Sequence, residues 1–212
     1  MIINFAGLQT FKIQFGDTIV SVNPASKESV NVKQPSRFGA DITLISLAHP
    51  DFNGVENNTV NGRDPFVIEG PGEYEVSGVT VMGFNSNAQY EGTKFNTVYM
   101  ITLEQMSLCF LGALADVNLS SEAYEKIDGV DILFVPIAGG NVLGPAEAYK
   151  LSIKLEAKLV VPCHYTNVKD DCVKEFLKES GEDDLKPIDK CTVKKRDLEG
   201  KNGEVKLISP SK

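Results

Sequence analysis

The stretch ADITLISLAHPDFNGVEN, residues 40–57, contains the pattern that decides the fold. It begins with a short apolar run that predicts a buried strand, and the turn sequence Asp-Phe-Asn-Gly follows it. His49 and Asp51 lie at this junction. Open α/β architectures gather ligand-binding groups just past their strand ends, so the junction is a candidate site. Taken alone, His49 is more simply a hydrogen-bonded strand-end histidine and Asp51 a turn residue.

A second histidine has the same placement. His164 follows the apolar run at 159–163 directly, and the chain has two histidines in all. Two histidines at two strand ends weaken the purely structural explanation of either. Their shared placement makes both histidines candidates for a ligand-binding site.

The first half of the chain contains a series of short segments that each predict a β-strand. Residues 11–22 alternate apolar and polar side chains around Gly16-Asp17, a pattern typical of a hairpin with a tight turn. The further short runs that predict strands are 41–46, 66–69, 79–84, 97–103 and 107–112.

In the second half, helices and strands alternate. Ser120 is typical of a helix N-cap, and Pro145 suits the first turn of a helix. The elements predicted here are a buried strand in 129–136, the helix from Pro145, a strand at 159–161, and a helix at 170–180 that ends at Gly181. This order predicts an α/β (α+β) protein with two mixed sheets and helices outside, folded as one domain over residues 1–212.

Composition restricts the functional class. The formal net charge of -8 would repel a polyanion, so no nucleic-acid partner is expected. No run approaches the roughly 20 apolar residues of a membrane span, so no membrane partner is expected either. Four scattered cysteines without a CxxC pair suit free thiols in a reducing compartment, which favours a cytoplasmic location. The basic stretch 190–201 interleaves acids and predicts a solvated edge strand and turn.

Residues 40–57 resemble the signature segment of the metallo-β-lactamase superfamily, in which a strand ends in HxHxDH and these side chains bind two metal ions. On that pattern Leu47 takes the first histidine position, His49 the second, Asp51 the aspartate and Phe52 the last histidine. Two of the four ligand positions are kept.

The resemblance extends through the chain in order. GLQTFKIQFGDTIVSVNP (7–24) is similar to the opening strands of the ascorbate-lactonase-like branch, and FLGALADV (110–117) is similar to the segment that supplies the metal-bridging aspartate, here Ala113. DILFVPIAGG (131–140) and VVPCHY (160–165) are similar to the end of that branch, where His164 takes the terminal metal-histidine position. The intervening histidine belongs within 83–92, which contains none. The resemblance implies a metallo-β-lactamase-type αββα sandwich.

It also implies a site that has lost most of its ligands. A catalytic zinc normally has three protein ligands and an open position, and Leu47, Phe52 and Ala113 donate no lone pair. The vestigial candidates are His49, Asp51 and His164. Asp116 and Cys163 are further cleft residues that could assist them. No cofactor is expected, with zinc or another divalent metal at a sub-stoichiometric level only.

Two functions follow from this. The first is a non-hydrolytic binding or assembly role on a scaffold of hydrolase ancestry. The alternative is a metal-dependent hydrolase of a lactone, ester or phosphoester that uses a single-metal or atypical site. A small-molecule or protein partner stays open, as does a homo-oligomer, and fold analogy alone cannot decide between these functions.

Overall fold

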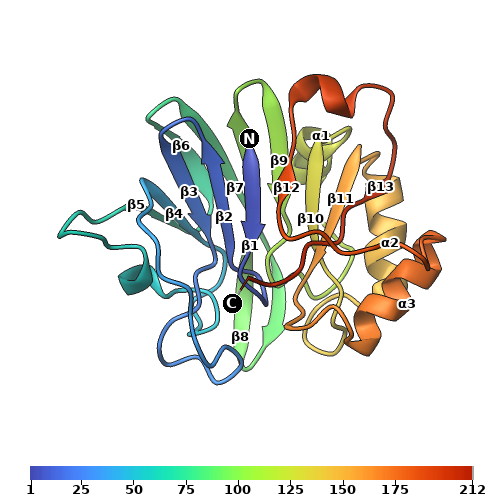
Figure 1. The fold of residues 1–212 in the computed structure, drawn as a ribbon, viewed down its shortest axis with the longest axis horizontal. Helices are drawn as coiled ribbons and strands as arrows, with labels where there is room; N and C mark the ends of the chain where they lie inside the picture. Colours follow the sequence, from blue (N-terminus) through green and yellow to red (C-terminus); the bar gives the residue numbers. More distant parts are fainter. Residues whose placement is uncertain (212) are drawn as a thin grey trace.

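The computed structural model describes residues 1–211, and two β-sheets packed face to face form its body (Figure 1). The first sheet has the strand order β12-β1-β2-β3-β4-β5. Its strands are β1 (Ile2–Phe5), β2 (Phe11–Phe15), β3 (Thr18–Val22), β4 (Ile42–Ile45), β5 (Phe66–Glu69) and β12 (Cys191–Thr192). β3 and β4 pair in parallel, as do β4 and β5, and the other pairs are antiparallel, so the sheet is mixed.

The second sheet has the strand order β13-β11-β10-β9-β8-β7-β6. Its strands are β6 (Gly72–Val76), β7 (Val79–Tyr90), β8 (Thr93–Leu103), β9 (Met106–Phe110), β10 (Ile132–Pro136), β11 (Leu159–Cys163) and β13 (Glu204–Val205). The β6 to β9 meander is antiparallel, whereas β9, β10, β11 and β13 run parallel. This sheet is mixed as well.

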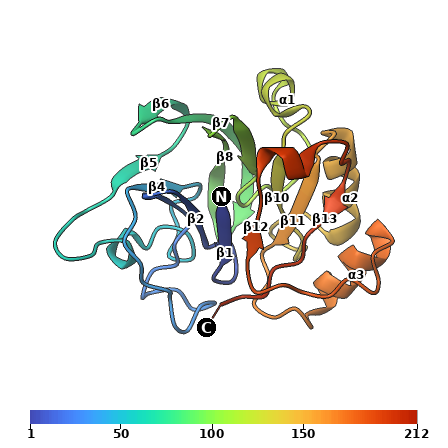
Figure 2. The same ribbon diagram turned by 45° about the horizontal axis from the view of Figure 1, so that its top comes forward.

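Within residues 1–211, three α-helices follow β9 in the chain. They are α1 (Ser121–Ile127), α2 (Pro145–Lys154) and α3 (Asp171–Ser180), and two 3₁₀ turns, η1 (Val55–Asn57) and η2 (Lys195–Leu198), complete the set. Helices α2 and α3 pack together outside β10, β11 and β13, which is clearest in the turned view (Figure 2). No helix within residues 1–211 is long and apolar enough to cross a membrane.

Local chemistry explains the element boundaries. The Ser120 side chain accepts a hydrogen bond from the Ala123 amide at 3.1 Å, which satisfies a free N–H group at the start of α1. Pro145 begins α2, and α3 ends at Gly181, whose φ of +72° suits a residue without Cβ. These three helix predictions are confirmed.

The inner faces of the two sheets form one large apolar core, to which the strands of both contribute. Aromatic rings join the layers: Phe11 of β2 contacts Phe110 of β9 and Phe134 of β10 with ring centroids 5.8 and 4.7 Å apart. The predicted fold class, an αββα sandwich of two mixed sheets, is confirmed. The predicted hairpin at 11–22 is also confirmed, with Phe15 opposite Thr18 in the register.

Two strands and one side chain differ from the sequence prediction. β7 runs to Tyr90 and β8 starts at Thr93, so this hairpin is longer at its tip than the predicted 79–84 and 97–103. The edge strand predicted in 190–201 is confirmed as β12. Lys195 within that stretch is not simply solvated, because its ammonium group lies 2.6 Å from the Asp131 carboxylate.

Asp131 ties the second sheet to the C-terminal segment. Its buried carboxylate accepts hydrogen bonds from Lys158 at 2.7 Å and Lys195 at 2.6 Å, and from the Ser107 amide at 2.9 Å. Burial on its own raises the pKa of Asp131, but these hydrogen bonds outweigh it and the pKa is lowered. The ionised carboxylate therefore stabilises the folded state at neutral pH.

We expect Asp131→Asn to lower the free energy of unfolding by about 1 to 2 kcal/mol at pH 7, since both lysines are partly exposed and solvent screens their charges. A lowered carboxyl pKa stabilises the fold above the unfolded value of about 4, and this stabilisation is lost as the pH falls below it. Urea denaturation should therefore give free energies of unfolding for wild type and variant that differ at pH 7 and differ less at pH 3. Asp171→Asn on α3 is the control and should lower the free energy of unfolding less than Asp131→Asn does, since it removes only an exposed ion pair with Lys174. A constant difference at both pH values would contradict this role for Asp131.

Candidate functional site at the strand ends

Tyr90 lies at the centre of the predicted site. Its ring is 5.0 Å from the His49 ring and 5.5 Å from the His164 ring, centroid to centroid, with edge-to-face geometry in both cases. Its hydroxyl donates a hydrogen bond to Asp51 Oδ2 at 2.7 Å. The structure thus gathers the three predicted side chains around one residue that the sequence analysis did not single out.

Several polar side chains of this site donate hydrogen bonds to Asp51. The side chain is fully buried, and besides Tyr90 it accepts hydrogen bonds from Ser29 Oγ and, at 2.8 Å, from Asn31 Nδ2. Burial raises the pKa of Asp51, but these three hydrogen bonds outweigh that effect and lower it. Asp51 is therefore an ionised carboxylate that holds the 24–41 loop to the strand ends through Ser29 and Asn31.

Both ring nitrogens of His49 are engaged. The Asp51 backbone amide donates to Nδ1 at 3.2 Å, and Nε2 lies 2.9 Å from the Glu91 carboxylate. An accepting Nδ1 in a neutral imidazole places the proton on Nε2, which then donates to Glu91. Neither nitrogen of His49 has a lone pair free.

His164 is fixed in the same tautomer by Gln9. Gln9 Nε2 donates to the Gly112 carbonyl at 2.9 Å, which sets the orientation of the amide, and the same nitrogen is 2.8 Å from His164 Nδ1. Nδ1 is therefore an acceptor, and Nε2 carries the proton. Burial lowers the pKa of His164 to about 4, against the opposing effect of the Asp51 charge, so the ring is neutral at physiological pH.

Apolar side chains fill the space between these polar groups. Six buried residues form a second hydrophobic cluster, separate from the main core: Leu47, Phe52, Ala88, Tyr90, Ala113 and Val142. Three of them stand at positions where the family resemblance placed metal ligands. Two further members of the cluster, Ala88 and Tyr90 of β7, lie within the 83–92 range predicted for the intervening histidine.

Two predicted cleft residues lie outside this site. Cys163 is buried in the main core, and burial raises the pKa of its thiol, so it is an inert core thiol. Asp116 is half-buried and makes hydrogen bonds to Asn87 at 3.4 Å and the Asn118 amide at 2.7 Å. Within residues 1–211 neither side chain makes a hydrogen bond to His49, Asp51 or His164, so their assistance stays a prediction.

The donor set does not fit a divalent metal. Within residues 1–211 no group of three or more His, Cys, Asp or Glu side chains is arranged to hold an ion. A histidine that bears its proton on Nε2 and accepts at Nδ1 offers no lone pair to a metal. Binding at His49, Asp51 and His164 would require their hydrogen bonds to Glu91, Tyr90 and Gln9 to break or rearrange.

Several residues of the site were missed from the sequence. The period of two along β7 could have identified Ala88 and Tyr90, because alternate residues from Phe84 onward are buried. Ser29 and Asn31 stand in an irregular loop and carry no such pattern. Gln9 reaches the site through the left-handed backbone of Leu8, which has φ +52° and which local sequence does not predict.

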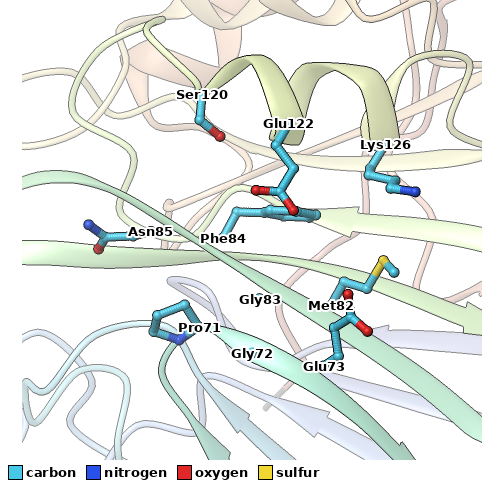
Figure 3. Close-up of a pocket in the computed structure, with 10 residues that line it drawn as sticks. All are labelled: Pro71, Gly72, Glu73, Met82, Gly83, Phe84, Asn85, Ser120, Glu122 and Lys126. Carbon is cyan, nitrogen blue, oxygen red and sulfur yellow. The ribbon is translucent and has the colours of Figure 1, made fainter.

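A cavity of about 500 Å³ adjoins His164 and Tyr90. A second hollow, of about 560 Å³, lies between the β6–β7 hairpin and α1, and Glu122 of α1 projects toward the Phe84 ring there (Figure 3). The second hollow is lined by none of the residues gathered around Tyr90. The cavity beside His164 is therefore the one that belongs to the candidate site.

Two packed mixed sheets with outer helices, and histidine and aspartate side chains gathered at strand ends, define the class: a metallo-β-lactamase-type sandwich. The family model of the beta-lactamase superfamily domain matches residues 2–164, and the chain belongs to this family.

Similar proteins are known by sequence and by structure. A UPF0173 metal-dependent hydrolase of Thermococcus onnurineus is 28% identical over 176 residues, which are 70% of this chain and 75% of that protein. One of Listeria monocytogenes serotype 4a is 26% identical, over 78% of this chain and 85% of its own length. The crystal structure of a Thermotoga maritima protein, described as a Zn-dependent hydrolase of the metallo-beta-lactamase superfamily, matches with a TM-score of 0.72 at 25% identity, covering 98% of this chain and 97% of that one.

Proposed function

We propose that this protein is a non-hydrolytic binding protein on a metallo-β-lactamase scaffold, descended from a hydrolase of the ascorbate-lactonase-like branch, whose metal site has been replaced by hydrogen bonds. One observation carries the proposal. The polar groups of His49, Asp51 and His164 that would face a metal are engaged by other residues of the chain or, at His164 Nε2, carry a proton.

The replacement is chemically consistent across the site. A metal ion would compensate the charge of the buried Asp51 carboxylate, and here three neutral hydrogen-bond donors stabilise that charge. Burial and the Asp51 charge raise the pKa of Tyr90, so its hydroxyl stays protonated and remains a donor. Phe52 and Leu47 fill the remaining volume with apolar atoms. A buried carboxylate that accepts three hydrogen bonds needs no cation to be stable.

The second candidate is a metal-dependent hydrolase of a lactone, ester or phosphoester with a single-metal or atypical site. Its support is the printed description of the relatives at 26 to 28% identity as metal-dependent hydrolases. For this candidate, His49 and His164 would have to exchange tautomers and release Glu91 and Gln9 on binding the ion.

An assay of hydrolysis separates the two. We expect the purified protein to hydrolyse p-nitrophenyl acetate, p-nitrophenyl phosphate and γ-butyrolactone no faster with added zinc or manganese than with EDTA. The physical reason is that no nitrogen lone pair is available to hold the ion that would activate water. Metal-dependent turnover that Asp51→Asn abolishes would refute the non-hydrolytic function and establish the second candidate.

A further inference from the structure

We propose that Asn61 is a site of spontaneous covalent modification, where the peptide between Asn61 and Gly62 rearranges to aspartate and isoaspartate with loss of ammonia. The chain contains three Asn-Gly pairs, which are Asn53-Gly54, Asn61-Gly62 and Asn202-Gly203. Glycine after asparagine favours this rearrangement because no Cβ shields the backbone nitrogen of the glycine. The structure leaves that nitrogen free at one pair and engages it in a hydrogen bond at the other two.

The reaction joins two neighbouring groups of the chain and consumes water. The Gly62 backbone nitrogen, after losing its proton, attacks the side-chain carbonyl carbon Cγ of Asn61. The new N–Cγ bond closes a succinimide ring, while the Cγ–Nδ2 bond breaks and ammonia leaves. Water then opens the ring: attack at Cγ gives aspartate, and attack at the backbone carbonyl carbon gives isoaspartate. One water is taken up and one ammonia is released, so no oxidant or reductant is needed.

Asn61 and Gly62 form the tip of a tight turn between η1 and β5. Val60 and Arg63 exchange backbone hydrogen bonds across it at 3.3 and 3.0 Å, and the φ angles of the two residues between them are +54° and +74°. Positive φ at both central residues defines a type I′ turn, in which Asn-Gly is preferred. The segment that carries this turn projects from the body of the molecule in both views (Figures 1 and 2).

The attacking nitrogen is unobstructed at this turn. Among the hydrogen bonds of residues 1–211 none involves the Gly62 amide, and Asn61 and Gly62 are both exposed. A Cβ built on Gly62 would meet nothing within 4 Å. Solvent therefore reaches the Gly62 nitrogen and the Asn61 carboxamide, and the backbone has room to rotate the nitrogen toward Cγ.

Hydrogen bonds engage the corresponding nitrogen at the other two pairs. The Gly54 amide donates to the Pro24 carbonyl at 2.7 Å, and a Cβ on Gly54 would lie 2.2 Å from the Ala25 carbonyl oxygen, so this backbone is closely enclosed. The Gly203 amide donates to the Ala157 carbonyl at 2.8 Å. Each of these bonds must break before the nitrogen can attack, and the free energy of that local opening slows the reaction.

Modification at Asn61 would change the surface beside the first sheet. Asn61 lines a hollow of about 330 Å³ together with Asp17, Asp41 and Arg63. The Arg63 guanidinium lies 2.8 Å from the Asp41 carboxylate, so each product adds a carboxylate where the cation is already paired. Isoaspartate also lengthens the main chain within the turn, and the hydrogen bonds between Val60 and Arg63 do not accommodate that extra length.

The three pairs can be compared in one sample. The full-length protein is incubated in mildly alkaline buffer, digested in acid to limit further reaction, and mapped by liquid chromatography and mass spectrometry. Asn61 should convert at least about tenfold faster than Asn53 or Asn202, because the amide hydrogen bonds of Gly54 and Gly203 must open first. In concentrated urea the three rates should lie within about threefold of one another, since unfolding removes those hydrogen bonds.

Two exposed asparagines, Asn61 and Asn202, provide a matched pair of variants. Isoaspartate is counted by methyl transfer from S-adenosylmethionine with a protein isoaspartyl methyltransferase. Asn61→Gln should remove most of the methyl-accepting isoaspartate that forms in the native protein, because the longer side chain closes a ring far more slowly. Asn202→Gln makes the same change where the glycine amide is hydrogen-bonded, so it should leave the amount unchanged.

Equal rates at the three pairs in the native protein, or faster conversion at Asn53 or Asn202, would overturn the inference. Conversion of Asn61 in urea but not in the native protein would overturn it too. A preference for Asn61 that is as large in urea as in buffer would show that sequence, and not the folded turn, sets the rate. Equal loss of methyl acceptance in Asn61→Gln and Asn202→Gln would likewise contradict it. The proposed function fails separately, on metal-dependent hydrolysis, because this turn contributes no residue to the cluster around Tyr90.

Discussion

Replacing Asp51 with alanine should lower the free energy of unfolding, measured by urea denaturation in EDTA, by about 3 kcal/mol, because three buried donors lose their charged acceptor at once. The three donors are Ser29, Asn31 and Tyr90. Two of them belong to the 24–41 loop, so amide hydrogen exchange in that loop should also increase. The loss arises without any metal, which is what separates a structural carboxylate from a metal ligand.

Asp116→Ala is the matched control. Asp116 is the other aspartate that the sequence placed in the cleft, and its side chain accepts one hydrogen bond from Asn87 and one from the Asn118 amide. Its removal should cost less than about 1 kcal/mol. If Asp51→Ala and Asp116→Ala lowered the free energy of unfolding in EDTA by the same small amount, Asp51 would have no structural role. A bound metal would then be needed to explain why this carboxylate is buried.

Restoring the family's ligands should have the second large effect. Leu47→His, Phe52→His and Ala113→Asp place three new donors in the apolar cluster that faces His49 and His164. Without metal, the triple variant should lose about 4 to 6 kcal/mol, since each change buries an unpaired polar group in place of a packed or small apolar one. The protein should then unfold at a clearly lower temperature.

Added zinc should reverse part of this loss in the triple variant. Binding to the folded state alone stabilises by mass action, and zinc at about 100 times its Kd should raise Tm by roughly 5 to 10 °C in a chain of this size. The natural protein should change by less than about 1 °C under the same conditions, because its donors are already hydrogen-bonded. A variant with Leu47→Gln, Phe52→Gln and Ala113→Asn controls for polarity. If the natural protein and the triple variant respond equally to zinc, the replaced positions are not eroded ligand positions.

The sequence predicted most of the fold because its strongest signals are local. Three of these signals each depend on a few neighbouring residues: the alternation of apolar and polar side chains in residues 11–22, the N-cap at Ser120, and Gly181, whose left-handed backbone ends α3. Tertiary contacts did not override them. The two-residue strand β13 was not predicted, because it exists only through pairing with β11, which is distant in sequence.

For the candidate site, the family resemblance implied which positions carry a residue that cannot bind metal, and it did not say how the side chains around them are arranged. His49, Asp51 and His164 were identified by their strand-end positions, and the structure gathers them around Tyr90. The tautomers of both histidines are set by Glu91, by Gln9 and by one backbone amide, none of which a single sequence connects to them. Side-chain hydrogen bonds between segments that are far apart in the chain therefore could not be predicted from the sequence.

The metal content of the native protein tests the central claim most directly. The protein should be expressed in ordinary medium, purified without chelators or added metal, and examined by inductively coupled plasma mass spectrometry with protein concentration from amino-acid analysis. Our account predicts well under one equivalent of zinc, iron and manganese together, because the side chains of His49, Asp51 and His164 are satisfied by Glu91, Gln9, Tyr90 and the 24–41 loop. One or two equivalents of a metal, lost on Asp51→Ala and not on Asp116→Ala, would contradict it and identify a working metal centre.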